Sequence, residues 1–147
     1  MSITGKGRID GQGKAWWDAA ENNLIPNHSR ARLIEPRNCK NFVMEDVTIS
    51  NPGFWGIHPY VCDGVRIENV VFSAPVTAPN TDGIDPDSCS NVIIRNFSAQ
   101  CGDDAIAIKS GRDIEGRNFN VSSHDILIEG EWCISALGLL SFLLLIL

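Results

Sequence analysis

The chain has 147 residues, which is enough for one domain with a hydrophobic core. Apolar residues make up 44% and charged residues 20%, the usual balance of a folded soluble protein. The net charge of -6, with no basic stripe, argues against a nucleic-acid partner. An acidic ligand would therefore need arginine or lysine placed locally. The five cysteines form no CxxC pair, and their odd number excludes a complete disulfide framework and disfavours a zinc site.

The first residues of the chain, 1–5, do not resemble an export signal. They contain no basic segment followed by an apolar one. We therefore expect no secretory signal in this sequence.

A weak repeat runs through the middle of the chain. Similar segments begin at Cys39, Cys62, Cys89 and, less clearly, Ser123. Apolar residues stand at the third, fifth, eighth and tenth places after each start, namely Phe42, Met44, Val47 and Ile49; Val65, Ile67, Val70 and Phe72; and Val92, Ile94, Phe97 and Ala99. Alternation marks a short strand, and the change from odd to even places marks a corner between two strands. The seventh place holds Asp46, Asn69 or Asn96, residue types that tolerate a left-handed corner.

This repeat predicts an all-β solenoid, the parallel β-helix. No copy can bury its inner face alone, so successive copies must stack. An antiparallel sandwich with similar strand spacing is the alternative. No helix is expected between residues 33 and 130, because no run there keeps a period of 3.6 residues for three turns.

The repeat is lost after Gly130. Glu131 stands where the fourth copy should have an apolar residue, and a largely apolar tail follows. We therefore predict a partial β-helix over residues 1–130 and a separate tail over residues 131–147. Three interpretations of the tail remain open: a sequencing or splicing artefact, a membrane anchor, and a buried strand or helix. Its apolar stretch is shorter than the roughly 20 residues that span a bilayer as a helix.

Two short acidic segments stand out, Asn80-Thr81-Asp82 and Gly102-Asp103-Asp104. Asp82 and Asp103 lie about one solenoid coil apart, and neighbouring coils are separated by about 4.8 Å. Asp104 would point the other way in an extended strand, so a bend at Gly102 is needed to bring it to the same side. Three close acids cannot all ionise freely, so we expect a raised pKa for at least one of them. A calcium site or solvated turn aspartates are the alternatives.

These segments carry a family resemblance. Residues 80–85 (NTDGID) followed by residues 102–111 (GDDAIAIKSG) resemble glycoside hydrolase family 28, the polygalacturonases. Residues 5–13, Trp16-Trp17 and residues 54–59 are similar to the same family, so that the resemblance covers about residues 3–130. It implies a right-handed parallel β-helix and hydrolysis of the α-1,4 bonds of pectic polygalacturonan with inversion. It also implies no cofactor or metal, a location outside the cell or in the periplasm, and, we expect, a monomer.

The resemblance also implies roles for the three acids. Asp103 matches the general acid that protonates the leaving oxygen, while Asp82 and Asp104 match the pair that holds and deprotonates the attacking water. An inverting acid and base are expected to lie about 6.5 to 9.5 Å apart, because the water must fit between them.

Three further residues are expected near substrate. Asn80 is expected to orient Asp82 or touch the sugar. Lys109 is expected to face a substrate carboxylate, with solvent exposure as the alternative. His58 is expected to line a subsite or else to be a packed histidine. His124 is interpreted as a residue at the start of a strand, and His28 as a loop residue.

Two other motifs of the family are not found in this sequence, a Gly-His-Gly and an Arg-Ile-Lys. Because the latter grips substrate carboxylates, we expect weak or no release of reducing sugar by this chain. A non-catalytic carbohydrate-binding β-helix is the alternative function, and a calcium-dependent pectate lyase is a further one. Residues 113–120 are expected to lengthen the loop beside the acids, which would suit a partly blocked, exo-type cleft.

Overall fold

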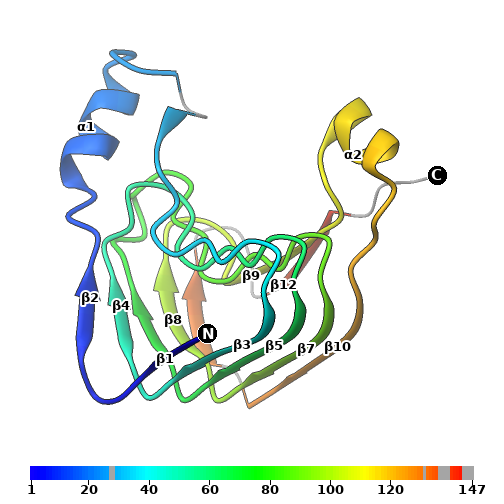
Figure 1. Cartoon of the computed structure of the whole chain (residues 1–147). Helices are drawn as coiled ribbons and strands as arrows, with labels where there is room; N and C mark the ends of the chain where they lie inside the picture. Colours follow the sequence, from blue (N-terminus) through cyan, green and yellow to red (C-terminus); the bar gives the residue numbers. More distant parts are fainter. Residues whose placement is uncertain (27–28, 131, 136–139, 144–147) are drawn as a thin grey trace.

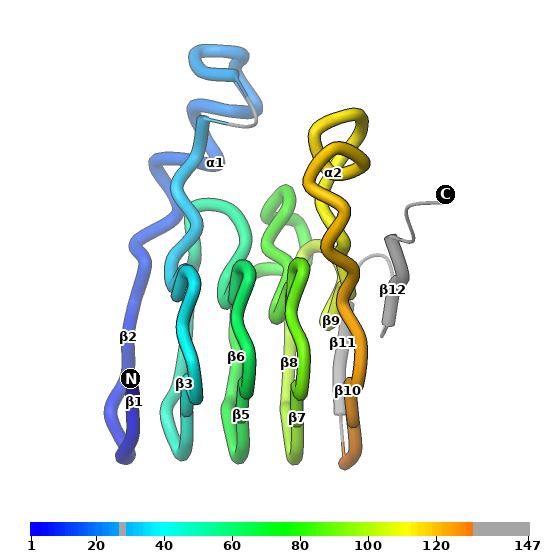
Figure 2. The backbone as a smooth tube through the Cα atoms, turned by 45° about the vertical axis from the view of Figure 1, so that its right-hand side comes forward, coloured from blue at the N-terminus to red at the C-terminus, as the bar shows by residue number. Residues whose placement is uncertain are grey.

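The protein is a parallel β-helix. The computed structural model describes residues 1–26, 29–130, 132–135 and 140–143, and Figure 1 shows the chain winding through successive coils. The coils stand beside one another along a common axis in Figure 2. Every strand pairs in parallel with the strand of the neighbouring coil. This confirms the solenoid and excludes the antiparallel sandwich.

Two five-stranded sheets form the longer sides of the solenoid. The first has the order β1 (Ser2–Thr4), β3 (Lys40–Glu45), β5 (Asp63–Glu68), β7 (Ser90–Arg95) and β10 (His124–Glu129). The second has the order β11 (Trp132–Ser135), β8 (Ser98–Cys101), β6 (Val71–Ser73), β4 (Thr48–Ser50) and β2 (Arg8–Asp10).

The third side is less regular. It contains β9 (Ile106–Lys109) paired with β12 (Leu140–Leu143). Over the earlier coils it consists of single parallel bridges, which link Ile34, Ile57, Ile84 and Ile106 in turn, and Arg37, Tyr60, Asp87 and Lys109 in turn. These two rows fix the register between coils on the side that carries the acidic segments.

Inward side chains of neighbouring coils stack to form the core. Phe42 pairs with Val65 and Val65 with Val92. A second row joins Met44, Ile67 and Ile94, and a third joins Ile49, Phe72 and Ala99. All of these side chains are at most 1% exposed. Burying each large one contributes about 1.5–3 kcal/mol, so stacking is the main source of stability.

The corner between the first two sheets has the backbone expected from the sequence. Asp46, Asn69 and Asn96 have φ angles of 63°, 54° and 49°, all in the left-handed region. Their side chains also form a ladder from coil to coil: Asn69 Nδ2 donates to Asp46 Oδ1 and Asn96 Nδ2 donates to Asn69 Oδ1, each at 3.1 Å. The ladder helps to keep neighbouring corners in register.

Two short helices interrupt the coils. Helix α1 (Lys14–Glu21) follows β2, and Trp17 Nε1 anchors it by donating to the Pro52 carbonyl at 2.9 Å. Helix α2 (Asp113–Phe119) follows β9. The expectation that no helix occurs between residues 33 and 130 is therefore wrong. Helix α2 has two turns and lies in an insertion between strands, where the strand repeat is interrupted. In Figure 2 both helices stand above the coils, at the end away from strands β5 and β7.

The tail expected after residue 130 includes two described strands. Backbone pairing aligns Trp132 of β11 with Ser98 of β8, and Leu140 of β12 with Ile106 of β9. The strand interpretation of the tail therefore fits its described backbone. Residues 131, 136–139 and 144–147, which include Glu131, lie outside the described residues. No helix in the described part of the chain combines the length and apolar composition needed to span a bilayer.

The stacked core predicts a large stability loss on truncation at Ile67. Ile67 is fully buried, whereas Val71, on a neighbouring strand, is 47% exposed. Ile67→Ala should lower the free energy of unfolding in urea by about 3 kcal/mol, because it removes transfer free energy and leaves a cavity. Val71→Ala should lower it by about 0.5 kcal/mol or less. Equal losses from both variants would contradict the assignment of the core.

Candidate active site

The three aspartates meet on the third side of the solenoid. Asp82 and Asp104 each precede a bridged isoleucine, Ile84 or Ile106, by two residues, so they occupy equivalent positions on neighbouring coils. Gly83 N donates to the Asp104 carbonyl at 3.0 Å and fixes this register. Asp103, expected about one coil from Asp82, stands one residue before the register partner of Asp82.

Asp103 joins the pair through a bend. It lies between the end of β8 at Cys101 and the start of β9 at Ile106, so it does not follow strand alternation. Glycine is required at residue 102 of this bend, because a Cβ there would lie 2.0 Å from the Ala78 carbonyl oxygen. One carboxylate oxygen from each of Asp82, Asp103 and Asp104 lies within 4.8 Å of the others. The expectation that a bend brings both neighbouring aspartates to one site is confirmed.

Thr81 holds the two acidic segments together. Its Oγ1 donates to the Ala78 carbonyl and accepts from Gly102 N, both at 2.9 Å. Because Thr81 is fully buried, these bonds are shielded from competing water. The positions of the carboxylates are thus fixed by the backbone of both segments.

The separation expected for an inverting acid and base, about 6.5 to 9.5 Å, is measured between whole carboxyl groups. The limit of 4.8 Å joins single oxygens, one from each of the three aspartates. Inversion therefore stays a prediction drawn from the family.

Burial sets the electrostatics of Asp82. Asp82 is only 5% exposed, and this burial raises its pKa to about 6. The positive charge of Lys109 opposes the rise, and the neighbouring Asp103 adds a smaller increase. The expectation that at least one of the three acids has a raised pKa is confirmed. A carboxyl of this kind changes protonation at mildly acidic pH.

Lys109 does not lie where the sequence placed it. It is 7% exposed, forms an ion pair with Asp85, and lies 3.4 Å from Asp82 Oδ2. Burial lowers the pKa of Lys109, but the two carboxylates outweigh this effect and raise it above its usual value. Lys109 therefore neutralises protein carboxylates inside the solenoid and is not exposed to solvent, and a contact with a substrate carboxylate stays a prediction.

Asp85 is a buried acid that the sequence did not single out. It is fully buried, and burial reinforced by Asp82 raises its pKa well above the usual range, against the effect of Lys109. Asp82 Oδ1 and Asp85 Oδ2 are both buried without a hydrogen-bond partner. Because Lys109 is their shared cation, removing it would leave two buried acids unpaired.

His58 and Asn80 also need correction. His58 is 3% exposed, with Nδ1 3.4 Å from Glu35 Oε2 and Nε2 3.5 Å from Asp87 Oδ2. It is the packed histidine of the two alternatives and does not line a subsite. Asn80 Nδ2 donates to Asp103 Oδ2 at 3.1 Å, so its partner is Asp103 and not Asp82.

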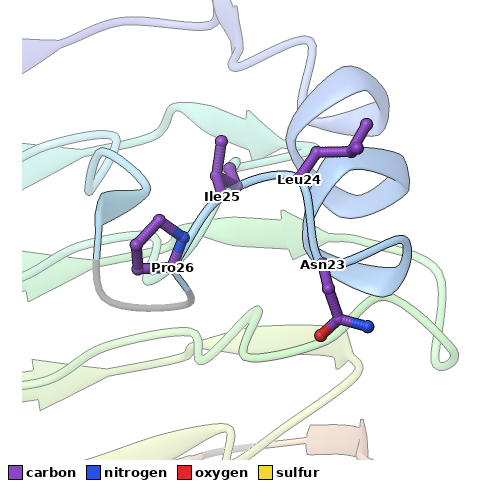
Figure 3. Close-up of a pocket in the computed structure, with 4 residues that line it drawn as sticks. All are labelled: Asn23, Leu24, Ile25 and Pro26. Atoms are coloured by element: carbon purple, nitrogen blue, oxygen red, sulfur yellow. The ribbon is translucent and has the colours of Figure 1, made fainter.

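The remaining motif residues lie elsewhere. His124 begins strand β10 and pairs with Asp125 at 2.8 Å, as expected for a residue at the start of a strand. His28 lies outside the described residues. Cys39, Cys62, Cys89 and Cys101 carry free thiols. A surface pocket after α1, shown in Figure 3, is lined by residues Asn23, Leu24, Ile25 and Pro26, none of which is titratable.

Comparison with known proteins identifies the family. The profile of glycosyl hydrolases family 28 matches residues 1–135. The chain belongs to this family.

Individual relatives agree with this assignment. A probable polygalacturonase from Vitis vinifera is 37% identical over 90% of this chain and 27% of its own length. An endo-polygalacturonase from Pectobacterium carotovorum subsp. carotovorum is 35% identical over 81% of this chain and 32% of its own. The crystal structure of a hyperthermoactive exopolygalacturonase from Thermotoga maritima superposes with a TM-score of 0.79 at 31% identity, covering 92% of this chain and 38% of that one. The chain thus spans about a quarter to a third of the length of these curated relatives.

The raised pKa of Asp82 predicts a pH-dependent stability. Its native pKa is about 6 and its ordinary value 3.8, so the native state binds the extra proton between these values. The contribution of Asp82 to the free energy of unfolding is therefore fully present below pH 3.8 and is lost as the pH rises through about 6. Asp82→Asn cannot ionise, so its stability relative to the parent protein should rise between pH 4 and pH 8 by up to about 3 kcal/mol.

Urea unfolding at a series of pH values measures this difference. Asp113→Asn is the matched control, because the Asp113 side chain is 80% exposed. The control should track the parent protein across the series. A difference between Asp82→Asn and the parent that stays constant with pH would contradict the assignment.

Proposed function

We propose that this chain carries the acid centre of a polygalacturonase, which hydrolyses the α-1,4 bonds of pectic polygalacturonan by single displacement with inversion. The observation that carries the proposal is the meeting of Asp82, Asp103 and Asp104, from two neighbouring coils of a family 28 chain, with carboxylate oxygens within 4.8 Å. Hydrolysis of a glycosidic bond needs one group to protonate the leaving oxygen and another to activate water, and clustered carboxyls supply both.

Each aspartate has a role in this proposal. Asp103, partly exposed at the bend, protonates the leaving glycosidic oxygen. Asp82 and Asp104, in register on neighbouring coils, hold the attacking water and take its proton. Because the pKa of Asp82 is raised to about 6, this carboxyl is available as a base only once the pH exceeds that value.

Two partly exposed arginines favour a polyanionic substrate in this proposal. Arg32 lies over the Trp55 ring at 4.6 Å, and Arg37 lies over the Tyr60 ring at 4.9 Å. Arg32 and Trp55 occupy the same position on their coils as Asp82, two residues before the bridged isoleucine. The side chains of Arg32 and Arg37 are 32% and 56% exposed, which leaves guanidinium groups available to carboxylates of a uronate chain. Glu35 pairs with both arginines and limits their orientation.

Helix α2 lies in the segment of residues 113–120 that was expected to lengthen the loop beside this face. Phe119 at its end stacks on Tyr60, with ring centroids 6.3 Å apart and planes inclined by 16°. An insertion held in this way would restrict the length of a bound chain, in keeping with exo-type cleavage. Location outside the cell or in the periplasm, and a monomeric state, are proposed from the family alone.

Substitution of Asp103 tests the proposed reaction. Asp103→Asn should lower the release of reducing sugar from polygalacturonate at least about 100-fold, because the acid that protonates the leaving oxygen is lost. Prolonged incubation with labelled oligogalacturonate allows the weak turnover expected of this chain to be measured. Asp125→Asn on β10, where the side chain is 71% exposed, should leave the rate unchanged.

Other outcomes would identify the alternative functions. A product absorbing in the ultraviolet, together with inhibition by a chelator, would indicate a lyase. Pectin binding without turnover, unaffected by Asp82→Asn or Asp103→Asn, would indicate a non-catalytic binding protein.

A further inference from the structure

We infer that Arg30 is a positioning residue for Asp103, acting through the side-chain amide of Asn80. The inference rests on the proposed function, because it assigns Arg30 a part in the protonation step given there to Asp103. Arg30 precedes the first bridged coil position and lies 50 residues from Asn80 in the sequence. No pattern in the sequence connects the two.

Arg30 is a buried cation with several defined partners. It is 2% exposed and lies over the Phe54 ring at 4.7 Å. Its Nη1 donates to the carbonyl oxygens of Pro79 at 2.8 Å and Gly53 at 3.4 Å, and its Nη2 donates to Asn80 Oδ1 at 2.6 Å. Burying a guanidinium costs several kcal/mol unless its donors are satisfied, so these bonds hold the group in one orientation.

The contact with Arg30 decides which way the Asn80 amide faces. A guanidinium only donates hydrogen bonds, so it can accept none from the amide nitrogen. The Oδ1 atom must therefore face Arg30, which turns Nδ2 toward Asp103 Oδ2 at 3.1 Å. The opposite orientation would bring an amide oxygen against the carboxylate and an amide nitrogen against a cation. Arg30 thus makes Asn80 a donor to Asp103.

This donor restrains the carboxyl of Asp103. Its Oδ1 accepts from the backbone N–H of Asp104 at 2.9 Å, and its Oδ2 accepts from Asn80. Because both oxygens are held by donors on different segments, rotation of the carboxyl is restricted. A general acid must be held within about 0.5 Å of its productive position, and the Arg30–Asn80 pair supplies part of that restraint.

Kinetics on two substrates test this role. Arg30→Lys keeps the charge but cannot bond Pro79 and Asn80 with one planar fork. It should lower kcat on oligogalacturonate about tenfold with KM within about twofold, because only the protonation step suffers. Hydrolysis of α-galacturonosyl fluoride, whose leaving group needs no proton, should change less than about twofold. Arg8→Lys, on a 59% exposed side chain of β2, should change neither rate.

A double-mutant cycle with Asn80→Ala separates positioning from a general structural effect. If Arg30 acts through Asn80, adding Arg30→Lys to Asn80→Ala should cause no further loss of kcat on oligogalacturonate. Additive losses, or equal losses on oligogalacturonate and on the fluoride, would overturn the inference.

An NMR measurement tests the same contact without turnover. The side-chain amide of Asn80 is assigned by the signals that disappear in Asn80→Ala. These signals should move toward those of a solvent-exposed asparagine, with faster hydrogen exchange, in Arg30→Lys but not in Arg8→Lys. Unchanged signals in Arg30→Lys would overturn the inference. Absence of turnover in the parent protein would instead refute the proposed function, and the amide signals would still show whether Arg30 orients Asn80.

Discussion

The register between neighbouring coils is the constraint on which the rest of this structure depends. Each coil buries its inner face only against the next one. The rows that hold this register therefore depend on one another, namely Phe42, Val65 and Val92 on one side and Ile57, Ile84 and Ile106 on another. A slip by one residue would turn every inward side chain outward. The ladder of Asp46, Asn69 and Asn96 and the parallel backbone bonds prevent such a slip. Because the acids lie on two coils, the same register also sets the distance between them.

The acid site combines exposed and buried charge. Asp103 and Asp104 are partly exposed at a bend, whereas Asp82 and Asp85 lie beneath them with Lys109 as their common cation. Burial penalises the charged form of a carboxyl and so raises the pKa of Asp82 and of Asp85. The buried ion pairs of Lys109 also join Asp82, a proposed catalytic residue, to Asp85. Their value is to hold positions, because a buried pair adds little net stability.

The regular part of the fold could be predicted because its causes are local. Alternation of apolar residues predicted the strands from Lys40 to Glu45 and from Asp63 to Glu68, and the residues at the seventh place predicted the left-handed corners. Helix α2 was missed, since it lies in an insertion with no repeat to guide the prediction. The solvent-exposed alternative for Lys109 was wrong, and the sequence could not choose between the two alternatives for His58. The partners of these two residues, Asp85, Glu35 and Asp87, lie on other coils, and the burial of both follows from the third side of the solenoid.

The sequence by itself determined the family, the repeating coil and the three aspartates of the proposed site. These follow from short motifs and from a period that each segment carries within itself. Only the tertiary structure decided that Asp104 is the register partner of Asp82, that Lys109 is internal, and that Arg30 turns Asn80 toward Asp103. The physical reason is the same in each case. Burial and pairing depend on residues from different coils, and stacking those coils creates contacts that no single segment contains.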